Sequence, residues 1–168
     1  MRRDVGGELT LFETVGIAAI TGLRSMAGPA LLSRAIRRGG VGELRGNLFG
    51  ALGSPKISAL LQLLMVGEMI ADKTPFVPAR TSAPALTGRA LSGALVGAAL
   101  FAAAGRRPIV GATLGVPSAV AAAYAGEKLR VRGPEKLGVP SSVLGFLEDG
   151  VVLFGGTRLL RSRELEPR

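Results

Sequence analysis

Five apolar runs, separated by short polar or Gly- and Pro-containing segments, follow one another along the chain. At 1.5 Å per residue, about 20 residues of helix cross the hydrocarbon core of a bilayer. A soluble bundle would carry charges along the outer face of each helix, and the third and fourth runs have no such face. The pattern predicts an all-α, multi-pass transmembrane bundle of four to five helices in one domain. The alternative is a soluble helical domain in which these runs form buried core helices. The expected spans are 15–35, 57–72, 86–105, 108–126 and 141–160, and residues 161–168 form an exposed tail.

The first run is expected to be a broken helix. Arg24 lies near its centre, and Gly28-Pro29 follows within about one turn. Proline inside a helix removes one hydrogen bond and clashes with the preceding turn, so we predict a break near Gly28-Pro29, with Ser25 as a cap. Broken helices at membrane depth occur where they are buried in protein or line a polar cavity.

The third and fourth runs are joined by only Gly105-Arg106-Arg107, which predicts an antiparallel helix hairpin. Small residues four apart allow the close backbone approach by which helices associate in lipid. We therefore expect a glycine-zipper type of packing within one chain or between copies in a homo-oligomer, unless the glycines and alanines only reflect a biased composition. The packing positions are Gly93, Gly97, Gly111 and Gly115.

Charged residues within the apolar runs are the main candidates for a functional site. A charge at the bilayer centre costs about 2.5–3.5 kcal/mol, and such residues usually face the bundle interior and mark ion, proton or substrate paths. Adjacent carboxylates need a proton or a cation between them. The alternative is a purely structural ion pair, because buried charges are normally paired whatever their role. The predicted polar centre, for translocation or ion pairing, comprises Arg24, Glu68, Asp72, Glu148 and Asp149.

A Pro-stiffened connection after the second run combines basic groups and hydroxyls. Such groups can hold a phosphate or a lipid headgroup, although snorkelling bases in a solvated loop would look the same. The candidate headgroup-binding residues are Lys73, Arg80, Thr81 and Arg89.

Composition excludes several kinds of site. The 168 residues include no Cys and no His, so a zinc site of the usual kind and His-dependent nucleophilic catalysis are ruled out. We expect no catalytic residues, no metal site and no cofactor. The formal charge is +9, but aromatic stacking groups are scarce and arginines flank the apolar runs, which favours an anionic bilayer over nucleic acid as partner.

With five spans, the lysines and arginines other than Arg24 divide eleven to nine between the two sides. The positive-inside rule needs a clearer bias to assign an orientation. The expected location is the plasma (inner) membrane.

Several charged motifs resemble a bacterial family of uncharacterised membrane proteins, domain of unknown function 4126. The resemblance extends from about Thr14 to Leu160 and implies a multi-pass membrane protein, but it brings no activity. The motifs are Gly22-Leu23-Arg24-Ser25, Gly67-Glu68 with Asp72-Lys73, Pro78-Ala79-Arg80-Thr81, Gly88-Arg89 and Gly93-Ala94-Leu95-Val96-Gly97-Ala98.

Three functions remain open at this point. The first is translocation of a small ion or solute through the polar centre, because intramembrane acids and broken helices are shared with transporter sites. The second is a structural or assembly role with no small-molecule site. The third is a membrane enzyme acting on a phosphorylated lipid, with Glu68, Asp72 and Asp149 holding magnesium.

Overall fold

The computed structural model describes residues 5–39, 41, 44, 47–72 and 81–161, and within them the chain forms helices and no strand. The predicted all-helical fold is therefore confirmed. The elements are α1 (Val5–Leu23), α2 (Ala27–Arg37), α3 (Asn47–Leu52), α4 (Pro55–Ala71), α5 (Ala83–Ala103), α6 (Pro108–Leu137), α7 (Ser141–Gly150), the π-helix η1 (Val151–Gly155) and α8 (Gly156–Arg161).

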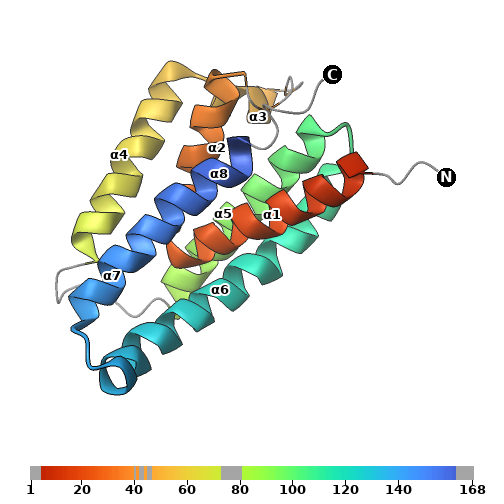
Figure 1. Cartoon of the computed structure of the whole chain (residues 1–168). Coiled ribbons are helices and arrows are strands. Elements are labelled where there is room, and N and C mark those ends of the chain that lie inside the picture. The colour runs from red at the N-terminus through yellow and green to blue at the C-terminus, as the bar shows by residue number, and fades with distance from the viewer. Residues whose placement is uncertain (1–4, 40, 42–43, 45–46, 73–80, 162–168) are drawn as a thin grey trace.

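The long helices run up and down between two ends of an elongated bundle (Figure 1). One end, which we call the network end, holds the last turns of α1 and α4, the first turn of α5 and the connection from α6 to α7. The other, which we call the basic end, holds the end of α2, the start of α4, the α5–α6 turn and α8. Six helical passes therefore connect the two ends.

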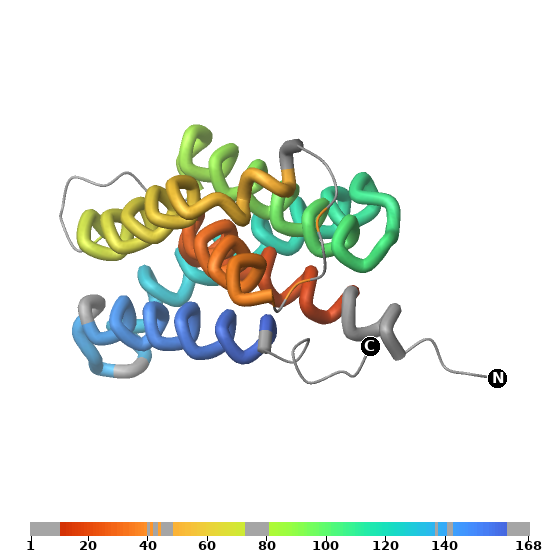
Figure 2. Tube along the Cα trace, turned by 90° about the horizontal axis from the view of Figure 1, so that it is seen from above, coloured from red at the N-terminus to blue at the C-terminus, as the bar shows by residue number. Residues whose placement is uncertain are grey.

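The first apolar run folds back on itself. α1 ends at Leu23, and after a turn at residues 24–26 α2 returns toward the basic end (Figure 1). A methyl group on Gly28 would overlap Thr21 Cγ2, so the two helices touch directly behind the turn. The predicted single span 15–35 is thus two helices side by side. Seen from above, α1 and α2 lie in the middle, between α4 and α5 on one side and α7–α8 on the other (Figure 2).

The break lies at residues 24–26, just before the expected Gly28-Pro29. Pro29 stands in the first turn of α2, where backbone N–H groups have no partner inside the helix and proline is tolerated. Gly28 gives α2 close contact with α1. The Gly-Pro pair therefore helps to start the second helix and is not the point of rupture.

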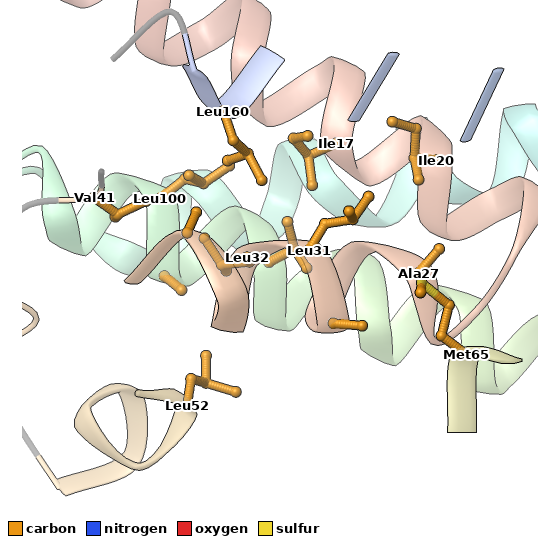
Figure 3. Packing of buried hydrophobic residues seen from close by; sticks show 14 of the residues in the cluster. Ile17, Ile20, Ala27, Leu31, Leu32, Val41, Leu52, Met65, Leu100 and Leu160 are labelled. Carbon is orange, nitrogen blue, oxygen red and sulfur yellow. The ribbon is translucent and has the colours of Figure 1, made fainter. Parts of the chain in front are cut away.

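The apolar core gathers around α2 (Figure 3). Almost every residue of α2 from Ala27 to Ser33 is buried, as expected for a helix with neighbours on all sides. Leu31 and Leu32 of α2 meet Ile17 of α1 and Leu100 of α5 in one cluster. α4, by contrast, buries only Ser58 and Met65 and lies at the periphery.

The α5–α6 hairpin is packed through its glycines. Gly93 lies against the Gly115 carbonyl and Gly97 against that of Gly111; a methyl group at any of the four would overlap the opposite backbone. This reciprocal fit brings two antiparallel backbones into contact, which side chains larger than hydrogen would prevent.

Two helices differ from their predicted lengths or shapes. α6 continues to Leu137, eleven residues beyond the predicted span, through a segment that contains helix formers such as Glu, Lys, Leu and Arg. Residues 141–161 form one continuous helical rod whose middle turn, η1, is a π-helix. Such turns are rare and often occur at functional sites; here it directly follows Glu148 and Asp149.

By length and composition, two of the described helices could cross a membrane: α5 (Ala83–Ala103) and the Pro108–Lys136 stretch of α6. These criteria are also met by core helices of soluble proteins, which are mostly buried. The apolar 18-residue window is 50% buried within the bundle in α5 and 28% buried in α6.

Candidate functional site: a buried network of paired charges

Arg24 is the centre of a charge network at the turn between α1 and α2. Its side chain is completely buried, with 0% exposure. Nε donates a 2.9 Å hydrogen bond to Asp149 Oδ1 of α7, and Nη2 lies 2.7 Å from the same oxygen. Nη1 is paired with Asp72 Oδ2 at the end of α4. One guanidinium thus ties two helices, distant in the sequence, to the turn.

Asp72 is shared with a second arginine. Arg130 of α6 places Nη1 2.7 Å from Asp72 Oδ2, and its Nη2 lies 3.6 Å from Glu148 Oε2 of α7. The charges alternate in one chain, Glu148–Arg130–Asp72–Arg24–Asp149. A carboxylate held by two guanidiniums keeps one partner when it releases the other.

Glu68 of α4 caps the start of α2. Its Oε1 accepts hydrogen bonds from the Ser25 N–H (2.8 Å) and hydroxyl (2.9 Å), and its Oε2 accepts one from the Met26 N–H (2.9 Å). A helix N-terminus carries unpaired N–H groups and a partial positive charge, so a carboxylate is favourable there. Ser25, expected to be the cap, is itself held by this carboxylate.

Arg89 of α5 binds the other helix end at the same break, the C-terminal end of α1. Its Nε donates to the Gly22 carbonyl in the last turn of α1 at 3.0 Å, and its Nη2 lies 3.6 Å from Glu68 Oε1. A cation at the C-terminal end of a helix complements its dipole. At the break, the cation Arg89 therefore stabilises the end of α1, and the anion Glu68 stabilises the start of α2.

The structure brings the five predicted polar-centre residues into one region. Of the four candidate headgroup residues, Arg89 belongs to this network, and Thr81 lies half-buried in the turn before α5 without a contact to it that the structure records. Lys73 and Arg80 lie outside the described residues. The four helix-packing glycines stand in the α5–α6 contact described above.

Arg130 is the member that sequence reasoning missed, because the predicted fourth span ended at residue 126. The signal was present in the small-residue face of α6. Its buried positions recur every three or four residues and include Gly111, Gly115, Ala119, Ala123, Gly126 and Gly133. Continuing that face past Gly126 places position 130 on the inner side of the bundle.

The arrangement is one of ion pairs and does not form a metal centre. Within the described residues, no three acidic side chains come together as a group that could hold a metal ion. Glu68, Asp72 and Asp149, the three expected magnesium ligands, are instead each occupied by an arginine. Chemically, the network can exchange charged partners and hold helices together.

The comparisons with known proteins match this chain to one family. The profile of a family described as "Domain of unknown function (DUF4126)" matches residues 11–159. No curated protein and no solved structure matches.

Proposed function

The chain belongs to the family DUF4126, and from this premise we propose that it is an integral membrane protein that moves a small ion through the buried charge network. Two observations support the proposal: an apolar outer surface around a charged interior, and a fully buried Arg24 shared between carboxylates of two helices.

Besides its apolar core, the bundle exposes large apolar side chains on most of its helices. Large apolar side chains on five helical segments point outward and are at least 66% exposed: Phe12 of α1, Leu63 of α4, Leu91 of α5, Ile109 of α6 and Phe154 of η1. Meanwhile Arg24 is fully buried and Arg89 is 6% exposed. Large exposed apolar surfaces usually mark sites of contact with protein or membrane, and a lipid environment would accommodate these side chains.

The pairing within the network supports this proposal, because it would let charges exchange partners one at a time. Charges buried away from water are costly unless they are paired, so the resting state is one in which arginines occupy the carboxylates. An ion passes when Asp72 and Asp149 exchange arginine for the ion. Asp72 also binds Arg130, so it keeps a partner when it releases Arg24. Arg24 also binds Asp149, so it keeps a partner in the same step.

The helix break is a further feature that this chain shares with transport sites. Transporters commonly build their central sites at breaks in helices, where the exposed helix ends face the substrate. In this chain, Glu68 and Arg89 occupy the two helix ends. The ends are thereby stabilised without bound substrate.

A flux assay in proteoliposomes tests the proposal with dyes for protons, Na⁺, K⁺ and Cl⁻. Wild-type protein should carry at least one of these ions faster than protein-free vesicles. Glu148→Gln, which affects one of the two longest ion pairs of the network, at 3.6 Å, should lower that flux with little effect on folding, and Arg24→Ala should abolish it. Glu135→Gln removes an exposed carboxylate from α6 and serves as the control. Absence of flux, or equal flux in all variants, would refute translocation.

A structural role is the second candidate, and the pairing of Arg24 with two carboxylates favours it. Buried ion pairs often can be replaced by neutral residues without loss of stability. We therefore suggest the neutral triple variant Arg24→Met, Asp72→Asn and Asp149→Asn. If the network only holds helices together, a folded triple variant retains every function of the wild-type protein in cells. If it carries ions, the variant folds but conducts nothing.

A further inference from the structure

At the basic end, a second charged feature stands apart from the network. A pocket of about 270 Å³ is lined by Arg34, Arg37 and Arg38 at the end of α2 and by Ser58 in the first turns of α4. α2 is eleven residues long, which separates the pocket from the Glu68 cap by about 16 Å. The proposed ion path does not use these residues.

The three arginines have no anionic partner in the described part of the chain. No ion pair or side-chain hydrogen bond is recorded for any of them, whereas Arg24, Arg89 and Arg130 are each bound to carboxylates. Ser58, a residue that is 3% exposed, lines the same pocket. Three exposed arginines and Ser58 thus line one cavity, and no described carboxylate is paired with these arginines.

The helix dipole does not account for this arrangement. Basic residues are favourable in the last turn of a helix, where they can bind the final carbonyls. The last carbonyls of α2 are instead satisfied by the backbone, since the Arg38 N–H reaches Arg34 and Ala35 and the Gly39 N–H reaches Ile36. The guanidinium groups therefore remain available to an external ligand.

We propose that this pocket, Arg34–Arg37–Arg38–Ser58, binds a phosphate-bearing anion. Guanidinium forks bind phosphate oxygens through paired hydrogen bonds. Pockets for drug-sized ligands begin at about 300 Å³, so the volume suits a phosphate group or a phospholipid headgroup. A soluble phosphate and a phospholipid headgroup would both present phosphate oxygens to the arginines.

The position of the pocket agrees with such a ligand. Of the described basic side chains outside the network, seven lie at this end and three at the other, so this end is the more basic one. Basic clusters beside membrane helices attract anionic lipids and their headgroups.

The test uses the full chain in detergent, with thermal melts followed by far-UV circular dichroism because the chain lacks Trp and Cys for fluorescence. Melting temperatures are measured with dioctanoyl phosphatidylglycerol, with dioctanoyl phosphatidylcholine and with inorganic phosphate at constant ionic strength. A ligand near a hundred times its dissociation constant should raise the melting temperature by roughly 5–10 °C. The double variant Arg34→Gln/Arg38→Gln should need at least about tenfold more ligand for half of that shift.

The control is Arg107→Gln/Arg158→Gln, which removes two exposed arginines from the same end but not from the pocket. A shift with phosphatidylglycerol alone identifies a lipid headgroup, and a shift with inorganic phosphate identifies a soluble anion as well. The proposal is overturned if neither anion shifts the melting temperature more than phosphatidylcholine does, or if both double variants lose the shift equally. Because these melts do not involve transport, the pocket and the proposed ion path can fail independently.

Discussion

Arg24 and Asp149 are 125 positions apart in the sequence, yet Arg24 Nε donates a 2.9 Å hydrogen bond to Asp149 Oδ1 inside the bundle. This contact, with the Asp72 pair beside it, attaches α7 and α4 to the turn between α1 and α2. The turn that breaks the first apolar run is therefore held from two other helices.

Removing members of this pair should destabilise the protein to different degrees. Asp149→Asn keeps the side-chain volume and leaves Arg24 with Asp72, so the loss of a charged hydrogen bond should cost about 1.5–3 kcal/mol in the free energy of unfolding. Arg24→Ala leaves two buried carboxylates without this partner and should cost about 3–5 kcal/mol. Unfolding in detergent, followed by circular dichroism, measures both. The exposed-site control Glu135→Gln should change stability by less than about 0.5 kcal/mol, and an Asp149→Asn variant as stable as wild type would contradict the assignment.

Glu68 should be needed for the start of α2. Glu68→Gln keeps one acceptor oxygen but loses the charge that faces the helix N-terminus, and Glu68→Ala loses both. We expect a loss of about 1–2 kcal/mol for the Gln variant and a larger loss for Ala.

Hydrogen exchange gives a local readout of the same contact. In the wild-type protein, the amides of Ser25 and Met26 donate to Glu68 and should exchange slowly. Both should exchange faster in Glu68→Gln and fastest in Glu68→Ala, while amides in the middle of α5 change little. Unaltered exchange at residues 25 and 26 would show that Glu68 does not act as the cap.

Two glycines of α5 should respond in opposite directions to the same substitution. Gly97→Ala places a methyl group into the Gly111 carbonyl, so α5 and α6 must separate; overpacking of this kind costs about 1–3 kcal/mol. Gly88→Ala, in the same helix, meets nothing within 4 Å and should stabilise the helix by about 0.5–1 kcal/mol through backbone entropy. Thermal unfolding of the two variants side by side measures the difference. If Gly97→Ala were as stable as Gly88→Ala, the helices would not be in backbone contact.

Much of this architecture could be predicted from local patterns. The apolar runs beginning near residues 57, 86, 108 and 141 correspond to α4, α5, α6 and the α7–α8 rod, because run length and flanking turn residues are local signals. The charged residues within apolar runs also predicted most of the residues that meet in the network. A buried charge without a partner is very unfavourable, so buried charges are normally found in pairs.

What the sequence could not supply were facts of tertiary geometry. Whether the chain continues past Arg24 or turns back depends on Glu68 and Arg89, which reach the two helix ends from other helices. The role of Arg130 likewise depends on α6 extending to Leu137, and helix ends are the least certain part of a pattern-based prediction.

The fold-back at residues 24–26 changes the expected topology, and this can be measured directly. A single span at 15–35 would place the N-terminus and Lys56 on opposite sides of a membrane. In the structure α1 starts at the same end as Lys56, because α2 returns the chain to that end (Figure 1). The basic residues outside the network whose side chains the structure describes then divide seven to three. The larger group is Arg34, Arg37, Arg38, Lys56, Arg106, Arg107 and Arg158, and the smaller is Lys128, Arg132 and Lys136.

That bias, unlike a near-even division, predicts an orientation, with the basic end in the cytoplasm. The chain has no natural cysteine, so Lys56→Cys, Arg107→Cys and Lys136→Cys can each be labelled cleanly by a membrane-impermeant maleimide. In intact cells Lys136→Cys should react, whereas Lys56→Cys and Arg107→Cys should react only after lysis. An N-terminal epitope tag should behave like Lys56→Cys. A tag accessible from outside while Lys56→Cys stays protected would mean that residues 15–35 cross the membrane once, and that the hairpin at Arg24 does not form.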